Sequence, residues 1–158
     1  MLDTAIETMH TPLKIDFSTG EVITPREVSY SFRLLFEERT ISILAYNLET
    51  VLAEKLETLL ARGTANTRMR DYYDIYVLNN KQEHNIDNAT LKEAFVNTSA
   101  KRGSIGLLSD VHLILKEVAE SIVLIDRWKN YQRKFDYAAD VLWADVMESV
   151  SCLVEIVK

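Results

Sequence analysis

The N-terminal part of the chain alternates apolar and polar side chains, which is typical of strands. Alternation over 13–17, a turn signal at 18–21 and a strand-like pair at 22–23 indicate short strands. The runs VSYSFRLLF (28–36) and RTISILAY (39–46) are rich in β-branched and aromatic residues and are separated by charged residues. They predict a β-hairpin. The first ten residues follow no packing pattern of their own and are separated from the rest by Thr11-Pro12, so they are interpreted as either a tail or half an element.

Apolar positions then recur at helical spacing to the end of the chain. Asn47 can cap a helix over 48–62 that ends at Gly63, and shorter helices are predicted over 70–78 and 90–98. Two apolar stripes predict two more helices. The first consists of Leu108, Val111, Leu115, Val118, Ile122 and Ile125, and the second of Leu142, Val146, Val150, Leu153 and Val157.

Together these patterns predict an α+β fold, with a small N-terminal antiparallel β-sheet followed by about five helices. We expect a partial β-sheet subdomain at 1–46 and a helical subdomain at 47–158. The length of 158 residues suits one domain of ordinary size. With only 4 Gly and 2 Pro, the chain lacks the turns that a many-stranded sandwich needs.

The charge balance narrows the classes of partner. Lys and Arg number 18 against 24 Asp and Glu, a net charge of −6, so the chain has no global electrostatic footprint for duplex nucleic acid, although a local basic cluster can still bind phosphate. We find no leader and no membrane-spanning apolar run, and the lone Cys152 cannot form an internal disulfide. A cytoplasmic setting without membrane contact is expected. Cys152 lies in an apolar-periodic segment and is predicted to be an inert packing thiol.

Three charged side chains lie at apolar positions of helices. Lys55 falls near the middle of the apolar stripe of helix 48–62, and Asp71 and Asp74 are spaced i,i+3 on a helix that is otherwise apolar. Either Lys55 packs its stem and extends its ammonium to a carboxylate, or the ammonium is held in a cleft to meet a phosphate. The position of the two aspartates is explained either by the helix dipole together with ion pairing, or by a role in a functional site. We predict that Lys55 lies within salt-bridge reach of Asp71 or Asp74.

Other candidates carry weaker signals. Arg62, Arg68 and Arg70 flank a polar loop and are candidate phosphate ligands, although such charges also form ordinary solvated faces. Asp16 lies in the alternating segment and is either a metal ligand or the exposed half of a strand. The three histidines and Cys152 are too far apart for a common zinc motif. The sequence contains no Walker loop, no Gly-x-Ser-x-Gly elbow and no dinucleotide fingerprint.

One continuous run carries a family resemblance. Residues 45–78, AYNLETVLAEKLETLLARGTANTRMRDYYDIYVL, combine a Tyr-x-Leu-Glu-Thr helix start, an Ala-Glu-Lys-Leu centre, an Arg-Gly end and Arg-x-x-Asp-Tyr-Tyr-Asp. Weaker matches are IDFSTGE, LKEAFVNTSAKRGS and WKNYQRKFDYA. With this order and spacing, the chain from about residue 14 to its end resembles the nucleotidyl transferase AbiEii/AbiGii toxin family of abortive-infection and toxin–antitoxin systems.

The resemblance implies a polymerase-β-type nucleotidyltransferase. In that family a Gly-Ser element and an Asp-x-Asp pair hold the metal-bound nucleotide, so Mg²⁺ and an NTP are the implied cofactors. Here the only Gly-Ser is Gly103-Ser104, and no Asp-x-Asp pair occurs. The resemblance assigns catalysis or nucleotide contact to Lys55 and to Asp71 or Asp74, and matches Asp16 to a third metal-site carboxylate.

We therefore expect the C-terminal portion of such a toxin, inactive on its own and without tight binding of Mg²⁺ or NTP. Its partners would be a cognate antitoxin, a polypeptide carrying the missing N-terminal half, RNA, or a second copy of the chain. The apolar strand 28–36 has Arg33 as its only charged residue, so its unpaired edge is open to pairing with a second copy of the chain, which favours a homodimer. The alternatives are a non-enzymatic helical module that docks an antitoxin or RNA, and a degenerate remnant.

Overall fold

A computed structural model describes residues 2–6, 9–13, 19–82 and 85–158. Within these ranges two antiparallel hairpins precede six α-helices, which confirms the α+β class. The strands are β1 (Leu2–Ile6) with β2 (Met9–Leu13) and β3 (Val28–Arg33) with β4 (Thr40–Ala45). The helices are α1 (Leu48–Arg62), α2 (Met69–Gln82), α3 (Asn88–Arg102), α4 (Val111–Glu120), α5 (Ile122–Lys134) and α6 (Trp143–Val157), with 3₁₀ turns η1 (Gly63–Ala65), η3 (Ile105–Asp110) and η4 (Asp136–Ala138).

The β3–β4 hairpin is confirmed, but the rest of the predicted sheet differs. Residues 22–23 are not in a strand. The next residue along the chain, Thr24, is instead hydrogen-bonded to the start of α1. There Asn47 Nδ2 donates to the carbonyl oxygen of Thr24 at 2.6 Å, and the Thr24 amide donates to Thr50 Oγ1 at 3.0 Å. The β1–β2 hairpin was not predicted. Residues 14–17 of the predicted strand, Asp16 among them, lie outside the described residues.

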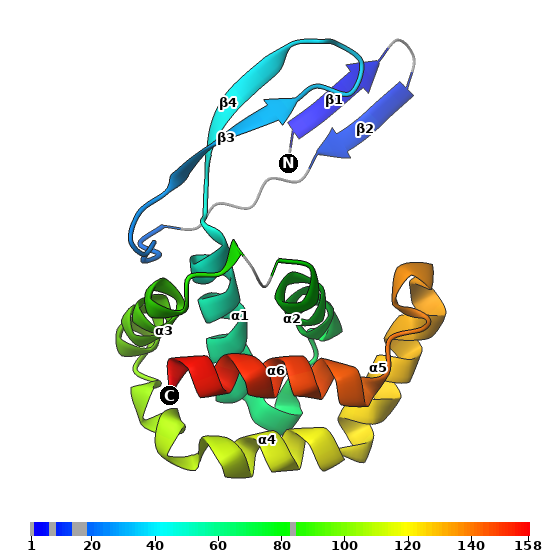
Figure 1. Ribbon diagram of the computed structural model, residues 1–158. Helices are drawn as coiled ribbons and strands as arrows, with labels where there is room; N and C mark the ends of the chain where they lie inside the picture. The colour runs from blue at the N-terminus through cyan, green and yellow to red at the C-terminus, as the bar shows by residue number, and fades with distance from the viewer. Residues whose placement is uncertain (1, 7–8, 14–18, 83–84) are drawn as a thin grey trace.

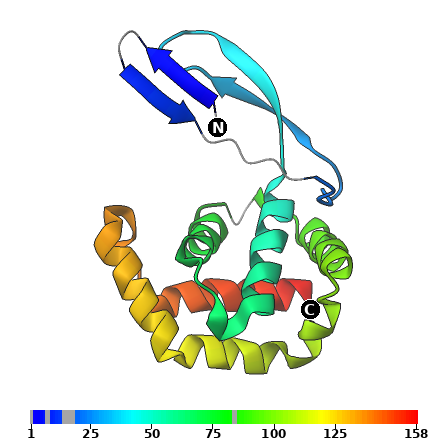
Figure 2. The same cartoon turned by 180° about the vertical axis from the view of Figure 1, so that it is seen from behind.

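The two hairpins lie at one end of the molecule, away from the helices (Figures 1 and 2). In the β3–β4 pair, Tyr30 opposes Ile43 and Phe32 opposes Ile41, so one face of the hairpin is apolar. These side chains are exposed: Tyr30 by 55% and Ile43 by 42%. The proposed division between residues 46 and 47 stays a prediction.

The helical body follows the predicted pattern except at one break. Asn47 caps α1 by accepting the Thr50 amide at 3.3 Å, and Gly63, with φ +48°, ends it as predicted. The single long helix predicted from the first stripe is wrong. It divides into α4 and α5 at Ser121, whose ψ of 109° leaves the helical region and whose hydroxyl accepts the Leu124 amide. The described residues therefore form six α-helices rather than five.

Helix α6 crosses the body, and α1 stands between α2 and α3 (Figures 1 and 2). The apolar stripe predicted for α6 is buried from Val146 onward, whereas Leu142 precedes the helix and is exposed. Cys152 is exposed, which corrects the prediction of a packing thiol: it is adjacent to Leu153 but about 100° away around the helix. None of the helices in the described ranges is long and apolar enough to cross a membrane.

Candidate functional site

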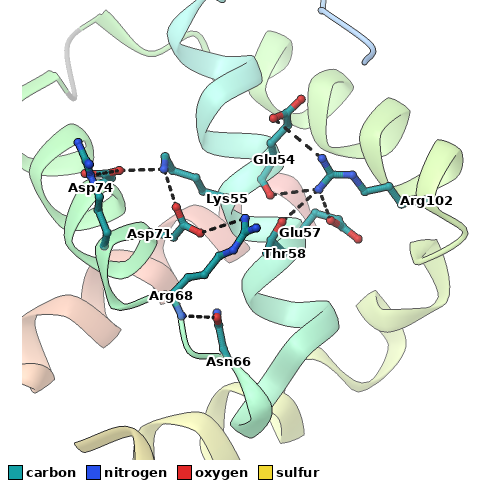
Figure 3. A network of polar contacts seen from close by, with 10 residues as sticks. Glu54, Lys55, Glu57, Thr58, Asn66, Arg68, Asp71, Asp74 and Arg102 are labelled. Carbon is teal, nitrogen blue, oxygen red and sulfur yellow. Dashed lines mark hydrogen bonds and ion pairs between the residues drawn. The ribbon is translucent and has the colours of Figure 1, made fainter. Parts of the chain in front are cut away.

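Helices α1 and α2 bring three charged side chains together at their interface (Figure 3). The Lys55 ammonium lies 2.7 Å from Asp71 Oδ1 and 2.8 Å from Asp74 Oδ2. Lys55 reaches this position because it shares the α1 stripe with Leu52 and Leu56, which are fully buried. The predicted ion pair is confirmed, and it involves both aspartates.

This cluster of Lys55, Asp71 and Asp74 is mostly removed from solvent, with side chains exposed by 20, 15 and 28%. Burial alone would lower the pKa of Lys55, but hydrogen bonds from its ammonium to Asp71 and Asp74 outweigh burial and raise that pKa. The ammonium therefore stays charged at neutral pH. A lysine ammonium has three N–H donors and two are used here, so one remains for a ligand.

The arginines around the cluster are placed unequally. Arg68 Nη1 lies 4.0 Å from Asp71 Oδ2, and Arg70 Nε lies 4.0 Å from Asp74 Oδ2. Their side chains are 59 and 81% exposed, so these long pairs contribute little to stability. Both guanidinium groups remain available to an anion. Arg62 is exposed at the end of α1 and is not brought to the cluster.

A second ionic cluster, centred on Arg102 of α3, was not predicted. Its Nη1 donates to Glu57 Oε2 at 2.6 Å and to Thr58 Oγ1 at 3.1 Å on α1 (Figure 3). Its Nη2 lies 3.6 Å from Glu21 Oε2, so one guanidinium joins α3, α1 and the segment before β3. Burial would lower the pKa of Arg102, but its bond to Glu57 raises it. Arg102 with Glu57, Thr58 and Glu21 therefore holds these segments together, and we call this cluster the clasp.

The one Gly-Ser pair of the sequence belongs to this clasp. Gly103 has φ +69° and ends α3 in the left-handed conformation. The Ser104 hydroxyl donates to Glu57 Oε1 at 2.6 Å, so both carboxylate oxygens of the buried Glu57 are satisfied. Gly103-Ser104 is therefore a helix end with a structural partner.

A cavity of about 290 Å³ lies between the two clusters. Glu54 lines it beside Lys55, and its Oε1 is buried without a hydrogen-bond partner among the described residues. Burial raises the pKa of Glu54, and the nearby charge of Glu21 raises it further. The full lining is Val51, Glu54, Lys55, Thr58, Arg68, Asp71 and Arg102. Three cations and two carboxylates thus surround a small polar space.

A larger cleft of about 690 Å³ opens at the start of α2 and shares Arg68 and Asp71 with the smaller cavity. We call it the basic–aromatic cleft. It is lined by Thr67, Arg68, Met69, Arg70, Asp71, Arg127, Asn130, Tyr131, Lys134, Phe135 and Tyr137. Sequence reasoning missed it, although the run WKNYQRKFDYA interleaves cations and aromatics, which is a signal for nucleic-acid binding.

Among the residues that the structure describes, the carboxylates around Lys55 do not fit a Mg²⁺ site. Asp71 Oδ1 and Asp74 Oδ2 both bind the Lys55 ammonium, which takes the position that a metal ion shared by these two carboxylates would need. Across the described ranges, no group of three or more His, Cys, Asp or Glu side chains is placed to hold a metal ion. Asp16 lies outside those ranges.

Comparisons with known proteins agree with the resemblance noted in the sequence. A family model described as "Nucleotidyl transferase AbiEii toxin, Type IV TA system" matches residues 2–149. No curated protein and no solved structure matches the chain. The family match spans both hairpins and all six helices up to the middle of α6.

Proposed function

Since the chain belongs to the AbiEii nucleotidyl transferase toxin family, we propose that it acts in a cytoplasmic toxin–antitoxin system as the phosphate-facing part of a nucleotidyltransferase. In this proposal Lys55 contacts the nucleotide, while Asp71 and Asp74 hold its ammonium in place. Arg68 and Arg70 complete the positive surface, and a cognate antitoxin is the expected protein partner.

The observation that carries the proposal is a charged ammonium with one uncommitted N–H at a cavity wall. Lys55 shares the cavity of about 290 Å³ with Arg68 and Arg102. Phosphoryl transfer depends on positioning and on cations that offset the charge of the phosphate oxygens. A lysine fixed by two carboxylates meets that need without a rotamer change, because its stem is packed in the α1 stripe.

We further propose that this chain does not transfer nucleotide by itself. Two-metal transfer requires carboxylates free to bridge metal ions, and the sequence has no Asp-x-Asp pair. Asp71 and Asp74 are already committed to Lys55. The metal-binding carboxylates would come from outside these 158 residues, on a segment that carries the Gly-Ser and Asp-x-Asp motifs.

A binding module without chemistry is the second candidate. It is favoured by the basic–aromatic cleft, whose cations and rings suit an anionic ligand, while no group of three or more His, Cys, Asp or Glu side chains in the described part of the chain is placed to hold a metal ion. In that case Lys55 would act as a structural ion pair, and docking of an antitoxin or of RNA would be the whole function.

Transfer of radiolabelled nucleotide tests the proposal. The purified chain is incubated with each NTP, Mg²⁺, and either cellular RNA or protein as the acceptor. We expect no incorporation. Metal-dependent labelling that disappears in Lys55→Ala would contradict the claim that these 158 residues do not transfer nucleotide by themselves. Lys92→Ala, which changes an exposed lysine on α3, is the matched control.

A further inference from the structure

The basic–aromatic cleft is positively charged, although the chain as a whole is acidic. The whole chain has a net charge of −6, yet the cleft is lined by Arg68, Arg70, Arg127 and Lys134 against one carboxylate. That carboxylate, Asp71, already binds Lys55 at 2.7 Å. The cleft is therefore a local positive site on an acidic molecule, which favours an anionic ligand.

The two cations on the α5 side have no acidic partner within the described part of the chain. Arg127 Nη1 donates to the carbonyl oxygen of Asn66 at 2.6 Å, a neutral acceptor that positions the guanidinium without cancelling its charge. Lys134 Nζ lies over the Phe135 ring, 5.5 Å from its centroid. Both charges are free to meet a phosphate.

The other half of the cleft consists of aromatic rings that touch one another. Phe135 and Tyr137 are stacked, with centroids 5.4 Å apart and planes at 27°, and Tyr131 lies 4.7 Å from Phe135. Tyr137 is 54% exposed. The Tyr73 ring also contacts Tyr137, with centroids 4.8 Å apart and planes at 48°, so the exposed part of Tyr137 is the ring surface that these neighbours leave uncovered beside the cations.

This platform is held rigidly. The hydroxyls of Tyr131 and Tyr137 are 2.8 Å apart, and Tyr73 donates to the carbonyl oxygen of Tyr137 at 3.2 Å. Gln132 Nε2 lies 3.0–3.3 Å from the carbonyl oxygens of Ala138, Ala139 and Val141, and its two N–H groups are shared among them, which fastens the end of η4 to α5. A ligand that stacks here would not have to order the rings first, so less conformational entropy is lost on binding.

We propose that the basic–aromatic cleft binds an unpaired nucleotide, with its base on the Phe135–Tyr137 platform and its phosphate between Lys134 and the arginines. Flat aromatic faces beside cations are how proteins bind single-stranded nucleic acid, and a base is free to stack only when it is unpaired. The volume of about 690 Å³ lies within the range of about 300–1,000 Å³ typical of ligand sites.

This inference rests on the proposed function, because it gives the acceptor or the donor nucleotide of that reaction a place on this chain. A free NTP and a single strand of RNA present the same chemistry. An acidic protein would need the cations but not the exposed rings, so we favour the nucleotide.

Fluorescence anisotropy without Mg²⁺ tests the inference. The probe is a fluorescein-labelled oligouridylate of about ten nucleotides, the length that one single-strand site covers. We expect it to bind in low salt and the same strand annealed to its complement to bind much more weakly. Competition by UTP at concentrations comparable to those of the oligomer would identify the free nucleotide as the source. Competition only by the oligomer would identify RNA.

Matched variants locate the site. Tyr137→Leu should weaken binding by roughly 5-fold or more through lost stacking, while Tyr30→Leu, which removes a tyrosine of nearly equal exposure from β3, should not. Lys134→Gln should reduce the slope of log affinity against log salt by about 0.7, and Lys92→Gln should leave the slope unchanged. Circular dichroism melts establish that each variant is folded.

Three results would overturn the inference: binding unchanged in both Tyr137→Leu and Lys134→Gln, duplex bound as tightly as single strand, or displacement of the probe by polyglutamate at equal charge concentration. The last would indicate an acidic protein partner instead. No transfer is measured in this assay. Loss of binding would therefore count against the cleft and not against the proposed function, whereas metal-dependent transfer by the chain alone would count against the proposed function and not against binding at the cleft.

Discussion

Replacing Lys55 by Met keeps the length and apolar stem of the side chain and removes only the ammonium that joins α1 to α2. The variant leaves Asp71 and Asp74 facing each other without a cation between them. Their nearest oxygens lie 2.7 and 2.8 Å from the same nitrogen, so they are no more than about 5.5 Å apart.

The loss of stability in Lys55→Met follows from the distance between the Asp71 and Asp74 oxygens. Two like charges about 5.5 Å apart repel by about 3 kcal/mol at an effective dielectric constant near 20. The two carboxylates are 15 and 28% exposed, so water and small rotations relieve part of this repulsion, while the lost ion pairs add to the cost. We expect the free energy of unfolding to fall by about 2–3 kcal/mol. For a chain of this length that lowers Tm by roughly 4–12 °C.

Thermal and urea unfolding followed by circular dichroism measure the change at pH 7. Lys92→Met on α3 is the control and should shift stability by less than about 0.5 kcal/mol. Adding Asp71→Asn and Asp74→Asn to Lys55→Met removes the repulsion and should recover more than half of the loss. The electrostatic reasoning is refuted if Lys55→Met costs no more than the control, or if the triple variant is no more stable than the single one.

Three further predictions concern the clasp, the cavity and the hairpin. Arg102→Met should lower stability by about 2–3 kcal/mol in urea unfolding, because the buried Glu57 keeps only its bond to Ser104; a change below 0.5 kcal/mol would refute the clasp. Glu54→Gln should raise stability at pH 7 by up to about 1 kcal/mol, because the fold raises the pKa of Glu54 and so disfavours its ionised form; the gain should shrink as the pH falls through the ordinary pKa of 4.5 and disappear by about pH 3, where the carboxyl is protonated in both states. Light scattering should give a homodimer of about 36 kDa, twice 18.2 kDa, because an apolar hairpin face is exposed; about 18 kDa at tens of micromolar would contradict it.

Local signals were enough to predict some elements from the sequence. Helix α1 begins after Asn47 and ends before Gly63 as predicted, because a cap and a left-handed glycine act within one turn. The break at Ser121 was missed because it involves neither glycine nor proline, and the apolar stripe continues in phase across it. The β1–β2 hairpin lacks the regular alternation that identified β3 and β4.

The candidate site divides in the same way. A lysine and two aspartates on apolar stripes need partners, so the contacts of Lys55 were predictable from burial alone. The basic–aromatic cleft was not, because it forms where α5 and η4 meet the start of α2. The contact between Arg127 and Asn66 joins residues 61 positions apart, and no periodicity reports such a contact.

The most direct measurement of the central claim is complemented nucleotide transfer. The chain is mixed with a polypeptide that carries the Gly-Ser and Asp-x-Asp motifs of the family, together with labelled NTP and Mg²⁺, at a temperature where circular dichroism shows every variant folded. We predict that incorporation appears only in the mixture, is lost with Lys55→Gln and is retained with Lys92→Gln. Equal incorporation with Lys55→Gln and with the unaltered chain would show that Lys55 only holds α1 to α2, and would contradict a phosphate-facing role.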